Sequence, residues 1–191
     1  NRCAPDPVLR LPHKNDAAER RCHAKNTLSG LSIVVRENTD LESPFAVEQF
    51  TIGYTMPILG TASGFCILAF MQSEKRQLLL DTLLSSENMN SEEYDQMTIQ
   101  RELKKVKEDG YAVNIRTRRF TDQTAISVPI INGDSQIKGA LTVRYSTTAY
   151  EIDEAIRLFV PSLNDSSAEI ASRIDLHIKR QANAFNSPNK P

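Results

Sequence analysis

The residues with the clearest chemical potential form a loop of small side chains, Gly60-Thr-Ala-Ser-Gly64, directly before an apolar segment. Thr61 or Ser63 can cap a helix that begins here, because a hydroxyl at this position accepts a hydrogen bond from a first-turn N–H group. The small Ala62 and Gly64 leave other N–H groups approachable, and with the helix dipole such groups bind a carboxylate or a phosphate. The same residues also fit an ordinary helix cap in which small side chains permit close packing. Both interpretations stay open.

No other group of residues matches a catalytic or metal-binding pattern. Ser63 does not stand in the G-x-S-x-G pattern of a nucleophile elbow, and the Walker A, H-E-x-x-H and C-x-x-C motifs are absent. His177 lies among apolar residues of a helical segment, where a packed structural histidine is expected. Four residues offer metal-ligand atoms at spacings unlike those of zinc sites: Cys3, His13, Cys22 and His23. The sequence therefore predicts no enzyme activity, no metal and no cofactor.

The composition is that of an ordinary globular protein, with 191 residues, of which 40% are hydrophobic and 25% charged. The net charge of -1 argues against DNA binding by this chain on its own, since such domains usually carry a basic excess. The 3 cysteines are an odd and widely spaced set, which favours a reducing, cytoplasmic location over a disulfide scaffold. The chain begins with Asn1 and not with Met, which indicates a processed or truncated product.

An uncharged stretch lies between Glu48 and Glu74, and its length could suggest a membrane span. It contains Pro57 and three glycines, which fit a membrane helix poorly. We therefore expect a buried strand, a loop and a core helix here, and no contact with a membrane.

Short strands and helices follow one another along the chain. Residues 1–28 are rich in turn-forming residues and are expected to be a linker or a poorly ordered segment, with a short helix near residues 16–24. The domain itself is expected over residues 29–184, followed by a frayed tail over residues 185–191. Strands are expected over residues 31–37, 45–52, 111–116, 125–131 and 136–145, and helices over 65–71, 74–85, 91–109 and 150–184.

Local signals mark the ends of several of these elements. Ser91 is the expected N-cap of the third helix, and Gly110 is its expected C-terminal stop. Asn132-Gly133-Asp134 predicts a hairpin turn, and Pro161 is expected to break or kink the last helix. Because the strands and helices do not alternate regularly, the order favours an α+β fold with a mostly antiparallel sheet over a doubly wound parallel one.

Six short motifs along the chain form a recognisable series. They are Gly53-x-x-x-Pro57, Thr61-Ala-Ser-Gly64, Ile67-Leu-Ala-Phe70, Val106-x-x-x-Gly110-Tyr111, Ile126-Ser-Val-Pro-Ile130 and Gly139-Ala-Leu-Thr-Val143. In this order they closely resemble the signature of the effector-binding domain of IclR-type regulators, over roughly residues 31–180. The resemblance implies a GAF-like fold, a curved antiparallel sheet flanked by helices, with an effector pocket on the sheet. It also implies a bacterial transcriptional regulator whose N-terminal winged helix-turn-helix is absent from this chain, so that DNA is a partner only through that domain.

The resemblance further implies which residues hold the effector. The loop residues Thr61, Ala62, Ser63 and Gly64 would bind its carboxylate through backbone and hydroxyl donors. Four strand positions would line the pocket: Asn114, Ala125, Thr142 and Arg144. Arg144 can clamp a carboxylate bidentately or cover a neighbour with its stem, and the sequence leaves this open.

The apolar residues Leu59 and Phe65 narrow the class of effector that we expect. They stand where the family often has His and Lys, and the pattern resembles the branch that regulates hydroxyphenylpropionate-type aromatic acid catabolism. We therefore expect a small carboxylic acid effector that is aromatic or otherwise bulky.

The family's regulators act as dimers or tetramers, so the resemblance implies a homodimer or homotetramer. The last helix and the exposed strand edges are the candidate interfaces. An effector can switch transcription only by binding two arrangements of the protein with different affinity.

Two alternatives to a sensor remain: a structural dimerisation module with a collapsed pocket, and a small-molecule enzyme on a GAF-like sheet, which would need a base near the loop.

Overall fold

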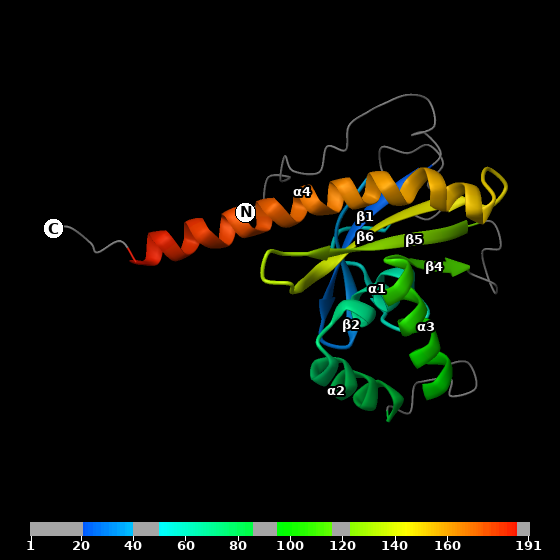
Figure 1. The fold of residues 1–191 in the computed structure, drawn as a ribbon, viewed down its shortest axis with the longest axis horizontal. Helices are drawn as coiled ribbons and strands as arrows, with labels where there is room; N and C mark the ends of the chain where they lie inside the picture. The colour runs from blue at the N-terminus through cyan, green and yellow to red at the C-terminus, as the bar shows by residue number, and fades with distance from the viewer. Residues whose placement is uncertain (1–20, 40–49, 86–94, 116–122, 187–191) are drawn as a thin grey trace.

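A curled antiparallel sheet forms the centre of the molecule (Figure 1). The computed structural model describes residues 21–39, 50–85, 95–115 and 123–186. Within them the sheet has 6 strands in the order β3-β2-β1-β6-β5-β4, and each neighbouring pair is antiparallel. The strands are β1 (Arg21–Ser29), β2 (Ser32–Asn38), β3 (Thr55–Pro57), β4 (Ala112–Ile115), β5 (Gln123–Ile131) and β6 (Ile137–Ser146). The helices are α1 (Ala62–Phe70), α2 (Ser73–Leu84), α3 (Gln96–Asp109) and α4 (Ile152–Asn186).

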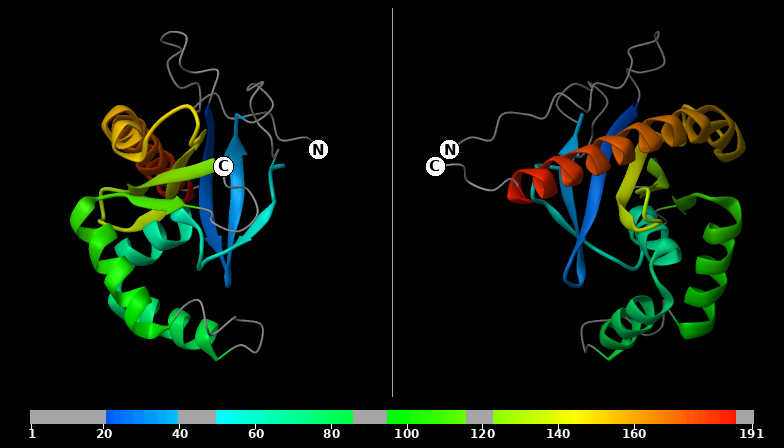
Figure 2. Two further views of the ribbon diagram at one scale, coloured as in Figure 1. Left: turned by 90° about the vertical axis from the view of Figure 1, so that its right-hand side faces the viewer. Right: turned by 60° about the vertical axis from the view of Figure 1, so that its left-hand side comes forward.

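Helices cover both faces of the sheet. The long α4 crosses one face, and α1, with α2 and α3 beyond it, lies on the other (Figure 2). A separate hydrophobic cluster fills each of the two layers. This arrangement confirms the predicted α+β, GAF-like architecture.

Side chains alternate between these two layers along the central strands. On the α4 side, β5 and β6 bury Ile126, Val128, Ile130, Leu141, Val143 and Tyr145 against the α4 residues Ala155, Phe159, Leu163 and Ile170. The intervening residues of the same strands point to the α1 side, since successive side chains of a strand face opposite ways. One face of β5 and β6 therefore forms core, and the other is available to build a site.

Pro161 lies inside α4 without ending it, so the expected break is not present. Proline removes one intrahelical hydrogen bond and is costly in an isolated helix. Here Phe159 and Leu163, which flank the exposed Pro161, are both buried against the sheet. Packing on both sides of the proline outweighs the lost hydrogen bond.

The helix after the small-residue loop is buried on all sides, as its uniformly apolar sequence predicts. Cys66, Ile67, Leu68 and Ala69 are all buried in the α1-side cluster. Burial raises the pKa of the Cys66 thiol far above its ordinary value, so this cysteine stays neutral.

Most of the other predicted elements are present. The strands β2, β4, β5 and β6 and the helices α2 and α3 fall within the expected ranges or within a few residues of them. Gly110 ends α3 with a left-handed φ of 81°, as its expected stop. The N-cap of α3 is Asp95, which accepts from the Thr98 N–H group, and not Ser91, which lies outside the described residues.

The predicted linker over residues 1–28 is wrong from Arg21 onward. Residues 21–29 form β1, which pairs with β2 and with β6 in the middle of the sheet. Among the side chains of β1 that the structure describes, residues 25–29, the buried one is polar, that of Asn26, so the sequence shows no apolar alternation there. The domain therefore includes residues before 29, the expected start. Residues 1–20 lie outside the described part.

The second expected strand, over residues 45–52, is also corrected. Residues 45–49 lie outside the described residues, and residues 50–52 are not part of a strand. On the side of β2 away from β1, the pairing strand is the short β3, which follows a turn at Gly53 with φ of 91°. The helix α4 runs to Asn186, so the frayed tail cannot begin at 185, and residues 187–191 lie outside the described part. None of the described helices is long and apolar enough to cross a membrane.

Candidate functional site

The start of α1 leaves two backbone donors for another acceptor. Thr61 is the N-cap, and its Oγ1 accepts from the Gly64 N–H group at 3.1 Å. The Phe65 N–H group donates to the Thr61 carbonyl at 3.0 Å. The N–H groups of Ala62 and Ser63 are therefore the two first-turn donors that the helix itself does not use. The expected anion site would use these two donors, and Gly64, whose N–H group is bonded to Thr61 Oγ1, would contribute none.

The Thr61 hydroxyl serves the cap and not the cavity. It lies 3.1 Å from the Pro57 carbonyl and 3.3 Å from the Ile58 carbonyl, so its single proton is directed back into the preceding loop. Of the two loop hydroxyls expected to bind an effector, that of Ser63 remains for this role.

Position 64 requires glycine because no side chain fits there, and not because Gly64 contacts a ligand. A Cβ at this position would lie 1.8 Å from the Ile58 carbonyl oxygen and 2.8 Å from Thr61 Oγ1. Its absence allows the loop before α1 to fold back onto the first turn. The motif glycine therefore permits the close contact between this loop and the start of α1.

Three of the predicted strand residues form one row across the sheet. Asn114 on β4 pairs with Ala125 on β5, and Ala125 pairs with Arg144 on β6. Directly opposite residues of antiparallel strands point to the same face, so all three side chains lie on the α1 side. Thr142 lies two residues before Arg144 on the same strand and shares this face.

Asn114 connects the strands to the loop. Its Nδ2 donates a hydrogen bond to the Gly60 carbonyl, which lies just before the start of α1. The edge strand β4 is thereby held against the loop before α1.

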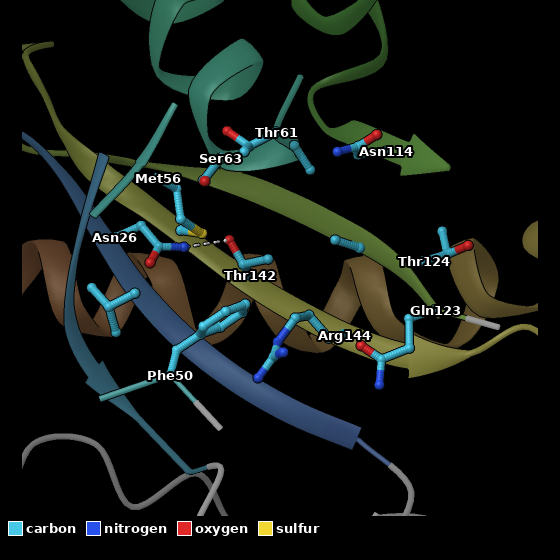
Figure 3. A pocket seen from close by; sticks show the side chains of 13 residues that line it. Asn26, Phe50, Met56, Thr61, Ser63, Asn114, Gln123, Thr124, Thr142 and Arg144 are labelled. Atoms are coloured by element: carbon cyan, nitrogen blue, oxygen red, sulfur yellow. Dashed lines mark hydrogen bonds between the residues drawn. The ribbon is translucent and has the colours of Figure 1, made fainter. Parts of the chain in front are cut away.

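A cavity opens between the start of α1 and this face of the sheet (Figure 3). Seven of the eight predicted residues line it, namely Thr61, Ala62, Ser63, Asn114, Ala125, Thr142 and Arg144. Gly64, buried behind the cap, does not. The structure thus brings the predicted residues together, while their role in binding stays a prediction.

Six lining residues were not predicted: Asn26, Val35, Phe50, Met56, Gln123 and Thr124. Asn26, Phe50 and Met56 belong to segments where the predicted strands were missing or misplaced, so no sequence signal placed them. Thr124 adjoins the cavity, yet it alternates with Ala125 along β5, which turns its side chain toward the α4 face.

The cavity has a volume of about 40 Å³. This is room for a few water molecules at about 10–15 Å³ each. Larger ligands therefore need the side chains at its border to move. Phe50 and Arg144 lie on this border, with the Arg144 guanidinium 4.4 Å from the centroid of the Phe50 ring. Phe50 also stacks on Tyr54 with 4.7 Å between ring centroids.

A chain of hydrogen bonds links the polar groups opposite the helix. Asn26 Nδ2 donates to Thr142 Oγ1 at 3.0 Å, and Thr142 Oγ1 lies 2.7 Å from Ser127 Oγ. Figure 3 shows Thr61 and Ser63 on one side of the cavity and Asn26 and Thr142 across from them. The cavity therefore has helix donors on one wall and an amide on the other.

Two further expectations concern metals and histidine. Within the described ranges, no group of three or more His, Cys, Asp or Glu residues could hold a metal ion. The four residues weighed as zinc ligands have no described side chains. His177 is exposed and hydrogen-bonds with Gln181, at 2.9 Å between Nε2 atoms, so it is not the packed residue that its apolar neighbours suggested.

The sequence match to a protein family decides what this domain is. Residues 26–172 match the family described as bacterial transcriptional regulator IclR, C-terminal. The chain belongs to the IclR family. The match begins at Asn26, inside β1, and so includes part of the strand that local sequence patterns missed. This IclR family consists of transcriptional regulators and not of enzymes.

Solved structures share the fold of this IclR domain. The Thermotoga maritima IclR has a TM-score of 0.69 at 18% identity, over 82% of this chain and 62% of that one. The C-terminal domain of the E. coli regulator KdgR has a TM-score of 0.66 at 18% identity, over 82% of this chain and 88% of that one. The inducer-binding domain of Acinetobacter PobR, a double mutant in complex with 3-hydroxybenzoic acid, has a TM-score of 0.64 at 17% identity. The match covers 78% of this chain and 87% of that one. This chain spans only 61% of a Rhodococcus sp. RHA1 protein of the same fold.

Proposed function

We propose that this domain is the effector sensor of an IclR-type regulator and binds a small carboxylic acid, with an aromatic acid as the expected class. The observation that carries the proposal is that Arg144 lines one cavity together with Ala62 and Ser63, whose N–H groups have no acceptor within the helix. The guanidinium and these N–H groups are both suited to a carboxylate, which accepts hydrogen bonds on both oxygens and is attracted by the positive helix end.

The other lining residues of the cavity favour an acid whose remaining part is apolar. Val35, Phe50, Met56 and Ala125 line it beside the polar groups. A site of this kind, mostly apolar with a few converging polar groups, is typical for small organic ligands. The structural neighbour PobR, as a double mutant, holds 3-hydroxybenzoic acid in its inducer-binding domain, and this supports an aromatic acid here.

Because the cavity is small, an acid can bind only if side chains at its border move. An aromatic acid would have to displace side chains at the border, with Phe50 and Arg144 the first in its path. Ligand binding would then favour one arrangement of this wall over another, which is the requirement for a switch. We propose that this change modulates DNA binding by an N-terminal winged helix-turn-helix in the whole regulator.

Oligomer formation is a part of the same proposal. The C-terminal half of α4 extends beyond the sheet (Figure 1) and leaves Leu176 and Ile178 exposed. This supports α4 as the contact between copies in a homodimer or homotetramer.

A thermal-shift screen of small carboxylic acids tests the proposed function. A ligand at 100 times its Kd should stabilise the domain by about 2.7 kcal/mol. For a domain of this size we expect a rise in Tm of about 5–10 °C. The panel should contain benzoates, phenylacetates and phenylpropionates, together with glyoxylate and pyruvate.

A matched pair of variants shows whether the binding occurs in this cavity. Ala125→Leu adds bulk to the cavity wall, and we expect it to abolish the shift. Ala168→Leu adds the same bulk on the exposed side of α4 and should leave the shift unchanged. A shift with two- and three-carbon acids only would contradict the aromatic class. The absence of a shift with every acid would contradict the sensor and favour a structural dimerisation module.

Arg144→Ala is expected to weaken the binding of the acid about 10- to 100-fold, since hydrogen bonds to charged groups contribute about 1.5–3 kcal/mol. Isothermal titration with the best acid of the panel measures this effect. Arg144→Lys retains the charge but not the bidentate geometry and should recover only a part of the affinity. Unchanged affinity in Arg144→Ala would remove Arg144 from the site and leave its stem as a cover for Phe50.

A further inference from the structure

Asn26 is a buried amide on the wall of the cavity opposite α1. It is only 1% exposed, although it lies on the central strand β1 where an apolar side chain would be usual. Its Nδ2 donates to Thr142 Oγ1. Its Oδ1 has no hydrogen-bond partner within the part of the chain that the structure describes. A buried acceptor left without a donor destabilises a fold, so its presence here calls for a function.

The backbone around Asn26 is also irregular. The pairing of β1 with β2 shifts between Lys25, opposite Glu37, and Asn26, opposite Val35, which leaves Arg36 without a partner in the ladder. Bulges of this kind redirect side chains and are common beside functional sites. Asn26 and Val35 consequently both line the cavity.

No donor among the described residues reaches Asn26 Oδ1. The neighbouring Thr142 hydroxyl has one proton and already accepts from Asn26 Nδ2, while Ser127 lies within hydrogen-bond distance of it. The adjacent cavity residues Val35, Phe50 and Met56 have no donor in their side chains. Within the described residues Oδ1 has no donor, so a group bound in the cavity could supply one.

We propose that Asn26 is a specificity-determining residue whose Oδ1 accepts a hydrogen bond from a hydroxyl group of the bound acid. This proposal rests on the proposed function, and it narrows the ligand class from carboxylic acids to hydroxy acids. The carboxylate lies at the start of α1, and the hydroxyl reaches the opposite wall. An acid without the hydroxyl leaves the amide unsatisfied and binds less well, since a site built to bond a hydroxyl discriminates against analogues that lack it.

The test compares each aromatic acid with its hydroxylated and methoxylated analogues. Isothermal titration is carried out with benzoate, phenylacetate and phenylpropionate and their ring-hydroxylated forms. For wild type we expect at least one hydroxy acid to bind roughly 10-fold more tightly than its parent acid. The methoxy analogue, which accepts but cannot donate, should bind no better than the parent.

Two variants on the same strand separate this role from a structural one. Asn26→Leu replaces the amide by an apolar group of similar size, and the ratio of the affinities for the hydroxy acid and its parent acid should fall to within about twofold. Thr27→Val, on the opposite face of β1, should retain the full preference. If Asn26→Leu does not fold, Asn26→Asp provides a second test, because its carboxylate still accepts a hydrogen bond but repels the acid.

Three outcomes would overturn the proposal. One is equal binding of parent and hydroxy acids by wild type, and another is equal loss of both in Asn26→Leu. A methoxy analogue that binds as tightly as the hydroxy acid would show that the amide donates and does not accept. Failure of every acid to bind wild type would instead contradict the proposed function itself.

Discussion

Replacing Gly64 with alanine is expected to destabilise the domain by about 3 kcal/mol, because the new methyl group has no space. Its Cβ would lie 1.8 Å from the backbone oxygen of Ile58. That atom belongs to the loop and cannot rotate away as the end of a flexible side chain can. Either the loop or the first turn of α1 has to move, and both carry the proposed anion site. Urea unfolding followed by circular dichroism measures the loss.

Gly53→Ala is the matched control for this substitution. Gly53 has φ of 91°, which alanine adopts only with strain, but no atom lies within 4 Å of the point where its Cβ would stand. We expect a smaller loss, of about 1 kcal/mol. Equal losses in the two variants would show that the close approach of Gly64 to Ile58 costs no more than backbone strain at an open position. A Gly64→Ala variant that retains wild-type stability would contradict the tight loop.

Replacing Phe159 with alanine is expected to cost about 3–5 kcal/mol of unfolding free energy and to lower Tm by about 10 °C. The ring is only 2% exposed and packs between two tyrosines on the α4 side of the sheet. Its centroid lies 5.6 Å from that of Tyr145 and 5.2 Å from that of Tyr150. Truncation would leave a cavity that these rigid rings cannot fill.

The neighbouring residue offers a close control. Leu158 is 52% exposed on the same turn of α4, so Leu158→Ala should cost less than about 1 kcal/mol. Calorimetry of the two variants checks the difference. Because Phe159 packs on the face of the sheet opposite the cavity, Phe159→Ala should bind the acid with wild-type affinity at temperatures where it is folded. A large loss of affinity would show that the two faces of the sheet are coupled.

The sequence determined those parts of the structure that depend on neighbouring residues. The uniformly apolar segment after residue 64 predicted a buried helix, which is α1. Asn132-Gly133-Asp134 predicted the hairpin of β5 and β6, and Gly110 predicted the end of α3. These signals are local, since they arise from periodicity, turn preference and helix capping. The anion-binding potential of the loop was visible for the same reason.

Only the tertiary structure placed Asn26 on the cavity, beside the residues that the family resemblance had implied. Asn26 is bonded to Thr142, 116 residues away along the chain, through the pairing of β1 with β6. No local sequence pattern predicts the pairing of β1 with β6. Because Asn26 is polar, β1 itself was not recognised as a strand. Likewise Pro161 reads as a helix breaker, yet the burial of Phe159 and Leu163 on either side keeps α4 continuous. At Asn26 and at Pro161, long-range packing outweighs the local structural preference of the residue. Predictions from local preference alone were therefore wrong at these two residues.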